Sequence, residues 1–218
     1  MLLLARRVFF SYHFQRDVWR ANQVRNSWVT HPDREAAGFF DAAEQEEVKL
    51  KTKKAIRRWI DRQLQHTSVT AILIGEKTAE REFVQYEIEK SIERGNALLG
   101  IRIDSLKNRQ GKRGSWGENP LDHYYIDTRS GEVALSRIFP TYQWKEDNGK
   151  QNMSEWVEEA IESISEIPAG KRDTLDHKPD KKGLGEQLVE SGLVIGGILL
   201  LGKAAQEVGD ALRRNQFR

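Results

Sequence analysis

The chain has 218 residues, a net charge of +2 and no cysteine. This length allows one α/β domain with an appendage. The near-neutral charge gives no reason to expect nucleic acid as a partner, and the lack of cysteine excludes structural disulfides and thiolate metal sites. The opening MLLLARRVFF leads into a strand and is not a signal peptide, so we expect a cytoplasmic protein.

Short apolar runs alternate with helical patterns over the first hundred residues. The predicted strands are residues 6–12, 37–43, 68–75 and 97–104, and the predicted helices are 15–29, 44–65 and the segment REFVQYEIEKSIERGN at 81–96. For the last helix, Thr78 is the expected N-cap and Gly95 the expected C-terminal stop. The alternation predicts a flavodoxin-like α/β fold, with a central parallel sheet of about five strands flanked by helices.

The second half of the chain is less regular. A basic stretch at 105–120 favours a mobile, solvated loop over a nucleic-acid site, and 152–166 has the pattern of a helix. The predicted organisation is a domain over 1–166, a polar linker over 167–187 and an apolar or amphipathic C-terminal helix over 188–218.

The C-terminal segment contains an uncharged apolar stretch, Gly192–Gly202. It is roughly half of the ~20 residues that a membrane-spanning helix needs. We expect it to pack on the domain or on another copy of the chain, which predicts a homo-oligomer. Contact with a membrane surface is the alternative.

One carboxylate stands out because of its position. Glu87 lies beside the apolar stripe of its helix and not on the solvated face. Ligands of parallel α/β sheets bind outside the carboxyl ends of the strands. The polar and aromatic residues that the sequence places at these ends are Ser11, Tyr12 and His13 after the first strand and Asp41 after the second. We therefore expect a ligand site there, with Glu87 leaning over it.

The segment that contains Glu87 resembles a motif of a known protein family. Phe83-Val84-Gln85-Tyr86-Glu87 is similar to the Trp-Cys-x-x-Glu motif of Toll/interleukin-1 receptor (TIR) domains, with Phe and Val in place of Trp and Cys. The blocks RRVFFSYHFQRDVWRANQVRNSW, AAGFFDA, TSVTAILIGEKT and VQYEIEKSIERGNALLGIRID resemble the TIR-like subunit (ThsB type) of bacterial Thoeris antiphage systems, over about residues 5–105.

The resemblance implies a TIR fold and cleavage of NAD, with release of nicotinamide and formation of a cyclic ADP-ribose-type signal. It makes Glu87 the catalytic residue. NAD is then the substrate, no separate cofactor or metal is expected, and the partners are a phage-derived trigger and a separate effector reached through the nucleotide signal. The residues expected to contact the substrate are Ser11, Tyr12, His13, Asp41 and Phe83.

Other interpretations of the same residues remain open. The chain could be a non-catalytic TIR-like scaffold that self-associates or binds a nucleotide. A receiver domain is disfavoured, because Gly75-Glu76-Lys77 follows the third strand where a phospho-acceptor aspartate is needed. Glu87 could pair with a lysine or arginine on the surface, and Asp41 could cap the following helix.

Overall fold

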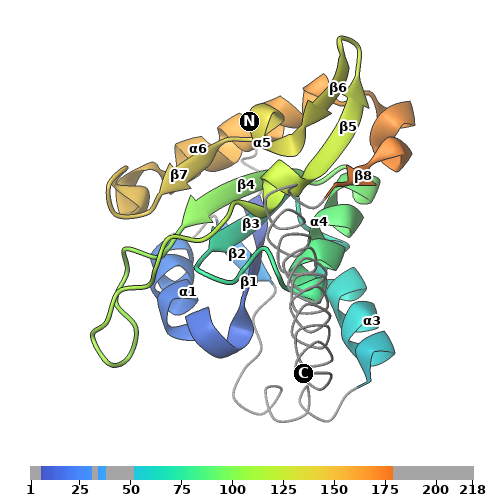
Figure 1. The fold of residues 1–218 in the computed structure, drawn as a ribbon. Helices are drawn as coiled ribbons and strands as arrows, with labels where there is room; N and C mark the ends of the chain where they lie inside the picture. Colours follow the sequence, from blue (N-terminus) through green and yellow to red (C-terminus); the bar gives the residue numbers. More distant parts are fainter. Residues whose placement is uncertain (1–5, 31–33, 38–51, 179–218) are drawn as a thin grey trace, which may run out of the picture. The chain divides into compact units, whose positions relative to one another are not determined.

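The computed structural model describes residues 6–30, 34–37 and 52–178, with 34–37 described by their backbone (Figure 1). The chain divides into two compact units, Met1–His177 and Lys178–Arg218, and all but one of the described residues belong to the first. Asp41, most of the predicted strand at 37–43, the start of the predicted helix at 44–65 and the whole predicted helix at 188–218 lie outside the described residues.

The central sheet has five parallel strands in the order β2-β1-β3-β4-β7. The strands are β1 Arg6–Tyr12, β2 Arg34–Ala37, β3 Val69–Ile74, β4 Ala97–Arg102 and β7 Thr141–Gln143. This is the flavodoxin-like order, in which the chain starts near the middle and reverses direction between β1 and β3. The predicted fold class is confirmed. The strand β2 shares only Ala37 with the strand expected at 37–43, and the rest of that expected strand lies outside the described residues.

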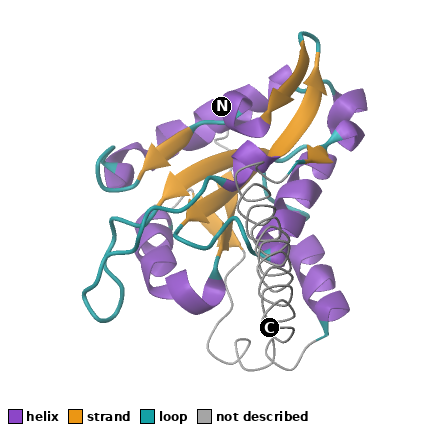
Figure 2. Cartoon of the chain, viewed as in Figure 1, coloured by secondary structure: helices purple, strands orange, loops and turns teal. Residues whose placement is uncertain are grey.

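Helices cover both faces of this sheet (Figures 1 and 2). They are α1 Phe14–Trp28, α3 Lys53–Leu64, α4 Glu82–Arg94 and α6 Gly149–Ser163, which continues into the 3-10 turn η2 Ile164–Glu166. A further short helix, α5 Leu135–Ile138, contacts residues 120–134 instead. The helix α1 contacts α6, and α3 contacts α4. Within the described part of the chain, no helix is both long and apolar enough to cross a bilayer.

The side chains of β1 alternate between two clusters of buried residues, one on each face of the sheet. Val8 and Phe10 join the larger cluster of buried residues that includes Trp28 of α1, whereas Phe9 packs with Trp59 and neighbouring residues of α3. Successive side chains of a strand point to opposite faces. One face of β1 is therefore covered by α1 and the other by the α3 and α4 layer.

A second, antiparallel sheet has the order β6-β5-β8. Its strands are β5 Tyr124–Thr128, which follows the 3-10 turn η1 Pro120–His123, β6 Gly131–Ala134 and β8 Asp176–His177. The 3-10 segment η3 Ala169–Thr174 precedes β8. Residues 169–177, which the sequence assigns to the linker, thus carry regular structure that packs on the domain.

The helix α4 begins later than the sequence predicts. Its N-cap is Arg81 and not Thr78. The Thr78 hydroxyl instead accepts a hydrogen bond from the Gly75 backbone N–H at 2.9 Å and donates one to the Leu73 carbonyl at 3.2 Å, so it closes the turn that follows β3. The expected C-terminal stop is confirmed, since Gly95 adopts a left-handed conformation with φ of 80°.

Candidate active site around Glu87

Ser11 and Glu87 meet on the α3 and α4 face of the sheet. Ser11 is the penultimate residue of β1 and shares the face of Phe9, two residues earlier. Its hydroxyl donates a hydrogen bond to Glu87 Oε2 at 2.5 Å. Both residues are buried, with exposed fractions of 1% and 8%. The structure thus joins two of the residues that the sequence singles out.

In the described part of the chain, the Glu87 carboxylate has no cation beside it. Among the residues whose side chains are described, no lysine or arginine pairs with it, and Ser11 provides its hydrogen bond. The sequence alternative of a surface ion pair is therefore wrong for the described part of the chain. Burial raises the pKa of Glu87 to about 8, although the hydrogen bond from Ser11 acts in the opposite direction.

Two small polar residues set the position of Glu87. Ser91, one turn further along α4, donates a hydrogen bond to the Glu87 backbone carbonyl at 2.6 Å. Its hydroxyl also lies 2.7 Å from the Thr70 hydroxyl of β3. Both are fully buried, so they hold α4 close to the sheet. The sequence alone does not reveal this contact. A serine four residues after Glu87, on the apolar side of the helix, is its only sequence signal.

Tyr12 and His13 lie at the same end of β1 but are directed differently. Tyr12 follows Ser11, packs against the larger core, and has its pKa raised above the usual range by burial and then by the Glu87 charge. The backbone carbonyl of His13 accepts hydrogen bonds from the first turn of α1. Its ring is buried, and burial together with the charge of Arg81 lowers its pKa, which favours neutral imidazole.

Phe83 contributes packing in the described structure. It is half-buried one turn before Glu87 and contacts the cluster of Phe9 and α3 residues. Tyr86 also connects the two helices, because its hydroxyl donates to the Asp61 carboxylate of α3 at 3.0 Å. Asp41, the remaining predicted contact, lies outside the described residues.

These observations define a class of protein. A flavodoxin-like sheet of order β2-β1-β3-β4-β7 carries a buried glutamate on the helix that follows β3, bonded to a serine at the carboxyl end of β1. This arrangement is that of a TIR-like α/β domain.

Comparison with known proteins identifies the family. Residues 9–108 match the family described as "Thoeris protein ThsB, TIR-like domain". The chain is also 37% identical, over 191 residues, to a protein of Bacillus cereus (strain MSX-D12) named "Putative cyclic ADP-D-ribose synthase ThsB1"; the match covers 71% of this chain and 100% of that protein. The chain belongs to the ThsB family of TIR-like proteins of Thoeris antiphage systems.

Proposed function

We propose that this chain cleaves the bond between nicotinamide and ribose in NAD and forms a cyclic ADP-ribose-type product that serves as a signal in antiphage defence. One observation carries the proposal: Glu87 is a buried carboxyl group with a raised pKa and no cationic partner among the described side chains. The printed name of the Bacillus cereus relative, a cyclic ADP-D-ribose synthase, supports the same reaction class.

The chemistry suits such a carboxylate. The leaving nicotinamide departs as a neutral molecule from a cationic pyridinium, so it needs no general acid. The ribose acquires oxocarbenium character, which an ionised carboxylate in a water-poor setting stabilises. The pyridinium of bound NAD supplies the positive charge that no described side chain provides for Glu87. Binding of NAD then favours the ionised form of Glu87 and releases its proton.

Ser11 is the positioning residue in this proposal. Its hydrogen bond fixes one carboxylate oxygen of Glu87 and leaves the other, Oε1, for a ribose hydroxyl or the developing charge. Cyclisation differs from hydrolysis only in the nucleophile. A nucleophilic atom of the adenosine half of the same NAD molecule attacks the ribose carbon in the first case and water attacks it in the second; nicotinamide leaves in both.

The test is release of nicotinamide from NAD by the purified chain, assayed alone and with extract of phage-infected cells, with chromatographic separation of linear and cyclic products. Glu87→Gln keeps the shape of the side chain and is expected to lower turnover by about 10³-fold or more. Glu93→Gln is the matched control. It lies on the same helix, is 60% exposed, and should retain wild-type turnover.

The outcomes separate the enzyme from a scaffold. Nicotinamide release that is lost in Glu87→Gln and kept in Glu93→Gln supports the proposal. Equal release by both variants would remove Glu87 from the reaction. No release by the wild-type chain under either condition would leave a scaffold as the better description.

A further inference from the structure

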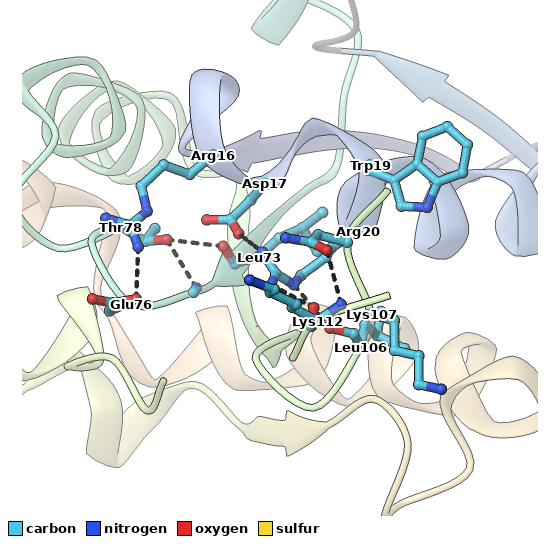
Figure 3. Close-up of polar contacts among 12 residues, drawn as sticks. Arg16, Asp17, Trp19, Arg20, Leu73, Glu76, Thr78, Leu106, Lys107 and Lys112 are labelled. Atoms are coloured by element: carbon cyan, nitrogen blue, oxygen red, sulfur yellow. Dashed lines mark hydrogen bonds and ion pairs between the residues drawn. The ribbon is translucent and has the colours of Figure 1, made fainter. Parts of the chain in front are cut away.

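A second site lies at the carboxyl ends of β1, β3 and β4. It is a cavity of about 320 Å³, bordered by the first turns of α1, the residues after β3 and the loop after β4. Figure 3 shows Arg16, Asp17 and Arg20 of α1 facing Glu76 and Lys112. Neither Ser11 nor Glu87 lines this cavity. It lies where the strand order reverses, the position at which open α/β sheets bind ligands.

The loop after β4 forms one wall of the cavity, and hydrogen bonds from α1 hold it. The Arg20 guanidinium donates hydrogen bonds to the carbonyls of Leu106 at 2.9 Å and Lys112 at 3.2 Å. Gln23 donates another to the Lys107 carbonyl at 3.0 Å. Residues 105–119 thus form a loop, as the sequence predicts, and α1 holds three of its carbonyl groups.

The floor of the cavity contains a buried ion pair. Arg20 Nη1 lies 2.7 Å from Asp17 Oδ1, and the two side chains are 7% and 4% exposed. Asp17 also packs against the end of β3, since a Cβ added to Gly75 would come within 2.5 Å of its Oδ2. This pair neutralises itself and fixes the shape of the cavity.

The other charged side chains that line the cavity give it a net positive charge. Arg16 pairs with Glu76 at 2.6 Å on the exposed side. Lys112 and Arg113 line the cavity, and their side chains have no acidic partner among the described residues. Asp104 is the one further carboxylate, and Asn108 and Ser115 add neutral polar groups. Two unpaired cations against one carboxylate, with neighbouring hydrogen-bonding groups, fit a phosphate that carries a hydroxyl-bearing moiety.

We propose that this cavity is a binding site for a mononucleotide-sized phosphate ester, separate from the Glu87 site. Lys112 and Arg113 hold the phosphate, Asp104 accepts hydrogen bonds from sugar hydroxyls, and the Asn108 side-chain amide donates one, because its oxygen already accepts from the backbone N–H groups of Gln110 and Lys112. The volume is at the lower end of the range for small-molecule pockets, about 300–1,000 Å³, which suits one nucleotide and not a dinucleotide such as NAD.

The test is isothermal titration calorimetry of the full chain with adenosine monophosphate, and with adenosine as the probe that lacks the phosphate. The wild-type chain is expected to bind the monophosphate at least about tenfold more tightly than adenosine. The double variant Lys112→Glu/Arg113→Glu should weaken the monophosphate by about tenfold or more. Lys107→Glu/Arg109→Glu is the matched control, since it makes the same charge change in the same loop at residues that do not line the cavity.

Three results would overturn the proposal. The first is no binding of the monophosphate by the wild-type chain at millimolar concentration. The second is equal weakening by both double variants, which would show a non-specific charge effect. The third is binding that is lost in Glu87→Gln and kept in Lys112→Glu/Arg113→Glu, which would place the monophosphate in the Glu87 site. Retention of binding by Glu87→Gln separates this proposal from the proposed NAD reaction, and thermal unfolding of each variant verifies that it is folded.

Discussion

At Glu87, burial raises the pKa of a carboxyl group from 4.5 to about 8. The folded protein therefore binds this proton more tightly than the unfolded chain does. The resulting stability is fully present below about pH 4.5 and is lost as the pH rises towards about 8. A buried acid of this kind is held in the fold at a cost in stability at neutral pH.

Glu87→Gln should consequently stabilise the protein above neutral pH, because the amide has no charge to bury. The expected gain in the free energy of unfolding at pH 8 is on the order of a few kcal/mol, and it should shrink towards zero near pH 5. Urea unfolding at the two pH values measures it. Glu93→Gln, an exposed control, should show little difference at either pH, and a gain for Glu87→Gln that is the same at pH 5 and pH 8 would contradict the raised pKa.

Ser11 offers a second residue-scale prediction, which depends on the proposed reaction. If ionised Glu87 is the catalytic form, kcat/KM for NAD should rise with pH through about 8, the pKa of the free protein. Ser11→Ala removes the hydrogen bond that lowers this pKa, so the rise should move to higher pH. Ser91→Ala is the control, because its hydroxyl contacts the Glu87 backbone and not the carboxylate. An unshifted profile for Ser11→Ala would show that Ser11 does not tune Glu87.

At the scale of elements, α1 carries two arginines that are expected to contribute very differently to the stability of the protein. Arg20 is buried in its pair with Asp17 and holds two carbonyls of the loop after β4. Arg16, four residues earlier, forms an ion pair with Glu76 in which the two side chains are 46% and 33% exposed. Removing one member of a buried pair leaves an uncompensated charge, whereas an exposed pair contributes little.

Arg20→Ala should therefore lower the free energy of unfolding by about 3–5 kcal/mol, and Arg16→Ala by less than about 1 kcal/mol. Denaturant unfolding of both variants gives the comparison. Amide hydrogen exchange should also show faster exchange in residues 105–115 for Arg20→Ala alone. Equal stability of the two variants would mean that the Asp17 pair does not anchor the loop.

The elements that could be predicted from sequence are those with long apolar patterns. The strand at 6–12 was predicted with the observed bounds, and β3 and β4 to within two residues, because their side chains are buried on both faces. The pairing of the antiparallel sheet could not be predicted, since its strands have two to five residues and no clear alternation. The start of α4 was misplaced because Thr78 bonds to a turn, and sequence does not reveal which nearby amide a threonine hydroxyl chooses.

The residues of the candidate site also fall into two groups, those that the sequence predicts and those that it does not. Glu87 and Ser11 could be found from motif spacing and from the strand that ends at the sheet's carboxyl edge. The Thr70–Ser91 contact and the Asp17–Arg20 pair could not, because each depends on how a helix is rotated over the sheet. An acid and a base three residues apart on a helix also match the pattern of a solvated face.

For the whole molecule, the segment after α6 belongs to the packed domain as far as His177. The His177 ring stacks on Tyr124 with centroids 4.5 Å apart, and Ile167 is 2% exposed. The Arg172 guanidinium lies against the C-terminal end of α4, where a Cβ on Gly95 would come within 2.0 Å of it. These contacts tie residues 167–177 to the helix that carries Glu87.

A chain that ends at Lys178 should therefore retain the thermal stability of the Met1–His177 unit, whereas one that ends at Glu166 should lose on the order of a few kcal/mol through exposure of Ile167 and loss of β8. Differential scanning calorimetry of the two truncated proteins measures the difference. Identical unfolding temperatures would show that residues 167–177 add nothing to the domain.

The order of the strands also has a consequence for how the protein is made. β1 is synthesised first, yet it occupies the interior of the sheet and pairs with β3, whose last residue is Ile74. At the usual pace of about 5–20 residues per second, the ribosome needs roughly 3–12 seconds to supply the intervening chain. During this interval the apolar stretch Val8-Phe9-Phe10 can pair with β2 but not yet with β3, and Arg6 and Arg7 beside it are the charged neighbours that discourage its association with other nascent chains.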